Sequence, residues 1–166
     1  MTPDTAIALA SAAVAGAALL VAVWEGVANR QHNRLSVRPL LRTDWHSEPG
    51  SLRVVVRNTG YGPAIIRDIR VFVESRAIAA SFPESLEVVI PQLNIETLPH
   101  GYAPMPGTPV APGEEFVLIE FPQTDGRPEL TRELVHALRP LTIVIHYTSL
   151  YNEVFSTTVA CRMVLR

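Results

Sequence analysis

Hydrophobic and polar residues divide the chain into one uninterrupted apolar run and a long region of alternation. The run, Ala6–Trp24, holds 19 residues without a charged side chain. A helix of that length spans about 28 Å, close to the ~30 Å hydrocarbon core of a bilayer. Pro3 and Asp4 suit the first turn of such a helix, and Trp24 falls where an interfacial aromatic residue belongs. The pattern therefore predicts a single N-terminal transmembrane helix.

Two other interpretations of the apolar run are weaker. A secretory signal peptide begins with a basic segment, whereas Asp4 is the only charged side chain ahead of this run. Small residues occur throughout, so the composition alone is compatible with a cleavage site. A buried core helix is disfavoured, because the run is apolar on every side and the rest of the chain has the pattern of strands. We expect residues 1–34 to form a retained anchor and juxtamembrane segment.

The predicted anchor is rich in alanine, with nine alanines between Ala6 and Val23. Ala8, Ala12 and Gly16 recur every four residues, a spacing of small side chains that lets two helix backbones approach closely. This stripe predicts packing against other membrane protein subunits, or self-association with a second copy of the chain. The alternative is that such a stripe arises by chance in any alanine-rich segment.

The flank before the predicted anchor has no Lys or Arg, whereas the flank after it has Arg30, Arg34, Arg38 and Arg42. The positive-inside rule then places the following domain in the cytoplasm. The chain has no lysine, which together with its alanine content is typical of a GC-rich bacterial genome, so we expect a bacterial inner membrane. Arg30 and Arg34 would share a helix face and, with Trp24, lie at the membrane interface, where each arginine contributes about 1 kcal/mol toward anionic lipid headgroups. The alternative is that arginine is simply the basic residue that this chain uses.

Residues 35–166 alternate apolar and polar positions over short runs, the pattern of half-buried strands. The alternation is clearest in 52–57, 69–74, 141–148 and 155–165, and it is weak in 37–42, where Pro39 suggests an edge strand. Segment 116–121 follows a Pro-Gly-Glu turn. Roughly seven strands with turns between them predict an all-β domain built as an antiparallel two-sheet sandwich.

Three segments interrupt this pattern. Asn58–Pro63 is a dense turn signal in which Gly60 or Gly62 is expected to take a positive φ. Pro99–Pro112 holds five prolines and is expected to be an irregular loop. Pro128–Leu138 has apolar residues at helical spacing, which predicts one short helix.

Three segments, taken in their order along the chain, resemble a known class of module. LRVVVRNTGYGPAIIRDIRVFVE, VAPGEEFVLIEF and LTIVIHYTSLYNEVF are similar to bacterial immunoglobulin-like and fibronectin-III-like domains, in which a strand ends in Asn-x-Gly and a Pro-Gly-Glu turn introduces a later strand. The resemblance covers about residues 35–165, and the plan of one anchor and one such domain is similar to small bacterial membrane proteins. It implies binding or scaffolding without catalysis.

Composition and motifs narrow the function further. Only 18% of residues are charged and the net charge is −2, which excludes a nucleic-acid binder with a strongly basic surface. The single cysteine, Cys161, excludes an intramolecular disulfide framework and is expected in the core. The five histidines show no metal-ligand spacing, and Gly60-x-Gly62 leads into Pro63 instead of a helix, so it is not a phosphate loop. We therefore predict no catalytic residue, no cofactor and no metal site.

These observations favour a non-enzymatic accessory or assembly subunit of a larger bacterial membrane protein complex. Its partners would be other membrane protein subunits and the lipid bilayer, reached through the anchor helix and the β-sandwich. The alternative is a tethered enzyme or a domain that binds a small molecule or metal without a recognisable motif, since loops of sheet domains often carry function.

Overall fold

The computed structural model describes residues 2–48, 51–93, 95, 98–122 and 128–160. The chain divides into a helical unit that ends at Ser36 and a second unit, called the β domain below, that begins at Val37. Cys161, predicted to lie in the core, falls outside the described residues.

The helical unit is a single helix, α1 (Pro3–Ser36), of 34 residues. Asp4 in its first turn and Arg34 in its last turn complement the helix dipole. The hydroxyl of Ser36 donates to the carbonyl of Asn33 at 3.0 Å, which occupies one of the carbonyls left open at a helix end. Leu35 and Ser36, which the alternation had suggested for the β domain, are therefore helical.

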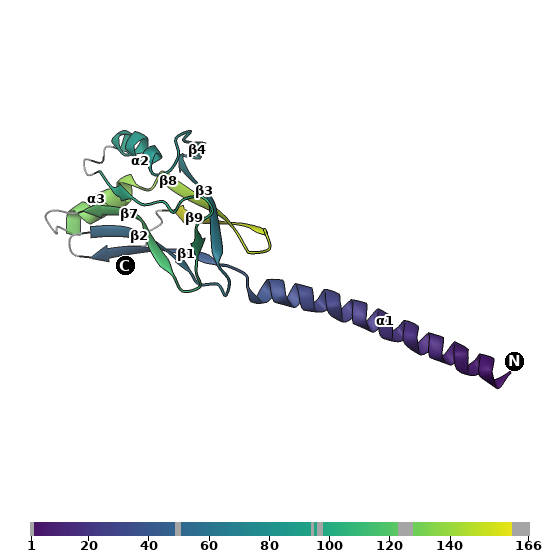
Figure 1. The fold of residues 1–166 in the computed structure, drawn as a ribbon. Helices are drawn as coiled ribbons and strands as arrows, with labels where there is room; N and C mark the ends of the chain where they lie inside the picture. The colour runs from purple at the N-terminus through teal and green to yellow at the C-terminus, as the bar shows by residue number, and fades with distance from the viewer. Residues whose placement is uncertain (1, 49–50, 94, 96–97, 123–127, 161–166) are drawn as a thin grey trace. The chain divides into compact units, whose positions relative to one another are not determined.

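The β domain contains two antiparallel sheets, as predicted (Figure 1). The first sheet has the order β1-β2-β7-β5, with β1 (Leu41–Glu48), β2 (Ser51–Asn58), β7 (Glu115–Pro122) and β5 (His100–Gly101). The second has the order β4-β3-β8-β9, with β4 (Arg76–Ala77), β3 (Ala64–Val73), β8 (Leu141–Thr148) and β9 (Val154–Ala160), and β6 (Pro109–Val110) pairs with β3.

One hydrophobic core receives residues from both sheets. Leu52, Val54 and Val56 of β2 are fully buried and alternate with less buried positions, as the period-2 pattern predicted. Leu118 and Ile119 of β7 are consecutive residues and both are buried, which strict alternation would not allow. The pairing of β2 with β7 shifts by one residue after Val54, so Leu118 is an extra residue that keeps its side chain in the core.

The structure corrects several details of the expected fold. The first strand begins at Leu41, and the preceding residues from Val37 form no strand. The segment 99–112, expected to be irregular, contains the two-residue strands β5 and β6.

The predicted short helix is confirmed as α3 (Pro128–Ala137), but a second one, α2 (Glu84–Val89), is followed by the 3-10 turn η1 (Pro91–Leu93). Figure 1 shows α2 and α3 at the periphery of the β domain. The sequence pattern did not predict α2, because its six residues are too few to display a helical period.

Candidate functional site

α1 is the first candidate, because it is long and apolar enough to cross a membrane. Every described side chain of α1 is exposed, and none of its most apolar window is buried within the chain. Ala8, Ala12 and Gly16 follow one another at intervals of one helical turn on this surface, and open space surrounds Gly16. The stripe is therefore sterically open to a partner helix.

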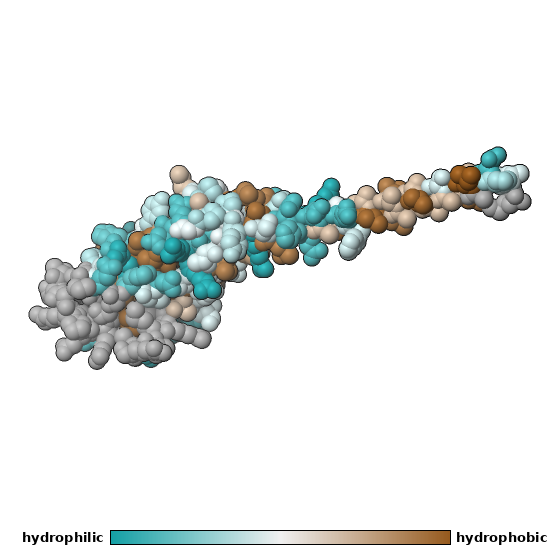
Figure 2. Space-filling model, turned by 90° about the horizontal axis from the view of Figure 1, so that it is seen from below, coloured by the Kyte–Doolittle hydropathy of each residue, from teal (hydrophilic) through white to brown (hydrophobic). Residues whose placement is uncertain are grey.

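The last third of α1 is polar. Beyond Trp24, which is exposed, the helix continues through Arg30 and Arg34, which lie four residues apart and so share a face. Figure 2 shows brown and tan residues along the N-terminal part of α1 and teal residues toward its C-terminal end. Arg30 lies about 9 Å and Arg34 about 15 Å beyond Trp24 along the axis of α1. The two arginines predicted for the membrane interface are therefore about one helical turn apart along the helix.

The second candidate is the end of the β domain at which the chain enters it, called the anchor end below. There the junction segment, Val37–Leu40, is fastened by the turn that follows β2. The Thr59 amide donates to the Leu40 carbonyl at 2.8 Å, and the Tyr61 amide donates to the Arg38 carbonyl at 3.1 Å. These two hydrogen bonds fix the junction segment to the turn that follows β2.

Asn58 is the centre of this fastening and is completely buried. Its Oδ1 accepts hydrogen bonds from the Leu40 amide at 3.2 Å and the Gly60 amide at 3.0 Å. Its Nδ2 donates to the carbonyls of Gly62 at 2.8 Å and Val110 at 2.9 Å. One amide side chain thus connects the junction segment, the turn and β6 with all of its common hydrogen-bonding positions in use.

Gly60 and Gly62 are required at this turn for a reason other than the predicted one. Neither is among the positive-φ glycines of the described residues, which are Gly107 and Gly113. A Cβ on Gly60 would instead overlap the Leu40 amide, and a Cβ on Gly62 would overlap the Val37 carbonyl. The prediction of positive φ is wrong, because close approach of the junction segment, which only the tertiary fold reveals, is what demands glycine.

The junction segment also contacts the second sheet. The guanidinium of Arg38 lies 4.9 Å from the ring centroid of Phe155, which stacks on Tyr147 with centroids 5.6 Å apart. The Tyr147 hydroxyl accepts a hydrogen bond from the Leu41 amide at 3.3 Å. The start of the β domain is thereby tied to strands of both sheets, and Arg38 has an aromatic partner inside the domain.

Several apolar side chains are displayed to solvent at the anchor end. Tyr61 is 84% exposed and Val154 is 75% exposed, and Leu40 and Leu150 are also exposed. They lie at one end because Thr148, near Leu150, pairs with both Ile65 of β3 and Val154 of β9. We call these four residues the apolar end surface. Nothing in the alternating pattern distinguishes them, because their shared position depends on strand pairing.

The β8–β9 hairpin that carries part of this surface is internally bonded. The buried Ser149 accepts amide hydrogen bonds at its Oγ from Tyr151 and Glu153. Arg67, the residue skipped by a bulge in β3, donates from Nε to Thr148 and from Nη2 to Asn152, at 3.1 and 3.2 Å. The hairpin is therefore held by its own Ser149 and by Arg67 of the neighbouring strand β3.

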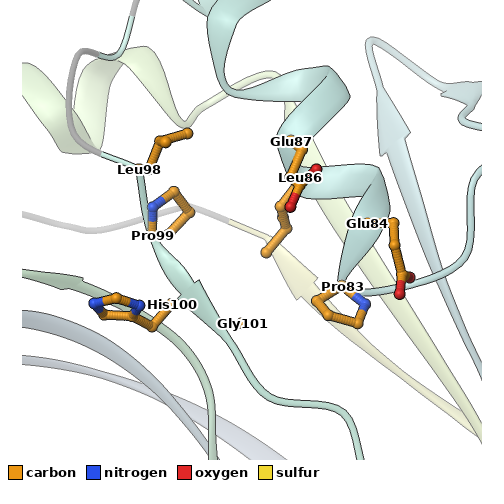
Figure 3. A pocket seen from close by; sticks show the side chains of 8 residues that line it. All are labelled: Pro83, Glu84, Leu86, Glu87, Leu98, Pro99, His100 and Gly101. Carbon is orange, nitrogen blue, oxygen red and sulfur yellow. The ribbon is translucent and has the colours of Figure 1, made fainter.

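A hollow of about 610 Å³ lies between α2 and the segment that leads into β5. Figure 3 shows Glu84 and Glu87 on α2, and His100 and Gly101 on the segment across from them. Glu84, Glu87 and His100 are all exposed to solvent. Within the ranges that the structure describes, no three His, Cys, Asp or Glu residues lie together as a metal site would need.

His146 is half-buried in β8. It is paired with Asp68 of β3 on one side and Ser156 of β9 on the other. Asp68 forms its ion pair with Arg70, and among the described residues no side-chain hydrogen bond joins His146 to Asp68 or Ser156. Asp68, His146 and Ser156 therefore lack the side-chain contacts by which a base would activate a serine.

Comparison with known families adds one result. A family described as a domain of unknown function, DUF8453, matches residues 5–163. The chain belongs to the DUF8453 family. The DUF8453 match begins within α1 and extends through the β domain, so both units belong to what the family shares. No curated protein matches the chain closely enough to indicate a relationship.

Proposed function

We propose that this DUF8453 protein is a non-enzymatic, membrane-anchored accessory subunit of a larger bacterial membrane protein complex. In this proposal α1 spans the inner membrane and the β domain is an immunoglobulin-like sandwich in the cytoplasm. The observation that supports it best is that the family match unites a fully exposed apolar helix with a two-sheet domain. A chain that pairs one packable anchor with one sheet domain is suited to binding.

The first contact in this proposal is made inside the membrane. Ala8, Ala12 and Gly16 form a shallow groove, and in lipid the close van der Waals packing of such a groove drives helix association. Gly16→Leu fills the groove while raising hydrophobicity, so we expect normal membrane levels with weaker co-purification of partners or weaker self-association. Ala10→Leu, a bulky change on another face, is the matched control. Equal retention of partners by both variants would show that the stripe reflects composition alone.

The cytoplasmic orientation rests on the arginines that follow the apolar run. Fusions of reporters to the C-terminus test it, because some reporters are active only in the cytoplasm and others only in the periplasm. We expect activity from the cytoplasmic reporter. A periplasmic signal would contradict the orientation, and an N-terminus that begins beyond residue 20 in the mature protein would contradict the retained anchor.

Affinity purification of the full chain from membranes tests the proposal as a whole. Stoichiometric recovery of other membrane subunits is expected. A monomer that carries a tightly bound metal or small molecule would instead favour the second candidate function, a tethered ligand-binding or catalytic domain. The hollow beside α2 favours that candidate, since its volume lies within the range of small-molecule sites. Glu87→Gln should then release the bound molecule, whereas it should leave the recovery of subunits unchanged if the accessory function is correct.

A further inference from the structure

We propose that strand β1 is an edge for self-association, along which the β domain pairs with the β1 strand of a second copy of the chain. The two β1 strands run antiparallel, so the first sheet continues from one copy into the other. This inference goes beyond the proposed function and does not depend on it, because β1 alone makes the contact. It is also separate from the stripe of small residues in α1.

β1 is a long strand at the edge of its sheet. Within the described part of the chain its only strand partner is β2, which pairs with all eight of its residues. The edge strands β4 and β5 have two residues each, and β9, the long edge of the second sheet, carries no charged residue. A long edge is a template for a further strand, because its outer backbone groups are unpaired. β1 combines this length with charges that can select the partner.

The backbone of β1 alternates between β2 and the open edge. The Leu40 carbonyl accepts a hydrogen bond from the Thr59 amide, so the residue just before the strand faces the β2 side. The pairing of β1 with β2 contains no register shift, so every second residue from Leu40 onward directs both backbone groups toward β2. The residues whose amides and carbonyls point to the open edge are Thr43, Trp45 and Ser47.

The outward-facing side chains of β1 favour one register with a second copy. Four exposed residues, alternately basic and acidic in type, follow one another on this face in the order Arg42, Asp44, His46 and Glu48. When two copies pair about a two-fold axis at Trp45, Arg42 lies opposite Glu48 and Asp44 lies opposite His46. Opposite partners directly across two strands are favourable. Registers displaced by two residues instead place Asp44 opposite Asp44, or Asp44 opposite Glu48. Only the register centred on Trp45 gives all four side chains an opposite partner.

The chain by itself leaves most of these side chains without such a partner. Arg42 lies opposite Arg57 in the pairing of β1 with β2, and like charges at opposite positions are unfavourable. Glu48 forms an ion pair with Arg53 of β2, but a carboxylate has two oxygens and can accept from a second arginine. Among the described residues, no ion pair or side-chain hydrogen bond within the chain is formed by Arg42, Asp44 or His46. A second copy therefore supplies what the single chain lacks.

Disulfide formation between two differently tagged full-length chains tests this register. Both chains carry Cys161→Ser, which removes the native cysteine, and membranes that contain them are oxidised with copper phenanthroline. Arg42→Cys in one chain and Glu48→Cys in the other should form a heterodisulfide, because such opposite residues have Cα atoms about 4.5 Å apart. Arg42→Cys with Asp44→Cys is the matched control. Its yield should be lower by about fivefold or more, because the register separates the two positions by about 14 Å along the strand.

Charge reversal between the two cysteine positions tests the chemistry of the contact. Asp44→Arg in both chains should lower the yield of the Arg42→Cys and Glu48→Cys heterodisulfide by about fivefold or more, because it faces His46 at two symmetry-related sites. Addition of His46→Asp should restore the yield to within about twofold. Urea unfolding midpoints should stay unchanged, because both side chains are exposed.

Three results would each overturn this inference: equal yields from the matched and control pairs, a yield that ignores the charge reversal, or no disulfide between the copies. None of them affects the proposed function, which the recovery of membrane subunits tests separately.

Discussion

Replacement of Asn58 by alanine should strongly destabilise the β domain. The side chain is completely buried and forms four hydrogen bonds, two as acceptor and two as donor. Its alanine replacement leaves the carbonyls of Gly62 and Val110 without the donor that they use now. Both residues are buried, so water does not easily replace the lost bonds.

The magnitude follows from these four contacts. A buried polar group left without its partner costs about 1–3 kcal/mol. The amides of Leu40 and Gly60 lie nearer the surface and can be rehydrated at lower cost, so the two carbonyls dominate. We expect the free energy of unfolding to fall by about 3 kcal/mol. For a domain of this size that corresponds to a decrease in Tm of about 10–15 °C.

Urea denaturation of the full chain in detergent measures this change. Trp45 of β1 packs against the core and reports unfolding by fluorescence, in a Trp24→Phe background that removes the other tryptophan. Asn33→Ala, at an exposed position of α1, is the matched control and should change stability by less than about 0.5 kcal/mol. A loss of less than about 1 kcal/mol in Asn58→Ala would refute the view that this amide fastens the junction segment.

Two further substitutions test the same junction. Gly62→Ala should lower the free energy of unfolding at least as much as Asn58→Ala does, because the new Cβ would overlap the backbone of Val37. Gly26→Ala, at a position with open space around it, is the control and should be neutral or slightly stabilising. Equal unfolding midpoints for the two glycine variants would contradict the close approach. Tyr147→Phe should lower the free energy of unfolding by about 0.5–1.5 kcal/mol in the same assay, because it removes only the hydroxyl that accepts a hydrogen bond from the backbone amide of Leu41. An unchanged midpoint would show that this hydrogen bond contributes nothing to stability.

The elements with a clear period could be predicted from the sequence. The alternation of Leu52, Val54 and Val56 indicated a strand with one buried face, and the structure buries all three. The uncharged run and its helix-starting residues likewise indicated one long N-terminal helix. The helix α2 and the two-residue strands β5 and β6 could not be predicted in this way, because segments of two to six residues are shorter than the patterns that identify them.

The sequence alone determined the elements whose evidence is local: where a helix long enough for a bilayer occurs, which residues alternate in strands, and where turns separate them. Only the tertiary structure decided how Asn58, Gly60 and Gly62 are used and which exposed residues share the anchor end. The Asn-x-Gly-x-Gly signal predicts a turn, but the atoms that bury Asn58 and exclude side chains at both glycines belong to the junction segment and to β6, distant in the chain. Such contacts form when strands pair and the core closes, so they depend on the whole arrangement of the sheets and leave no periodic trace in the sequence.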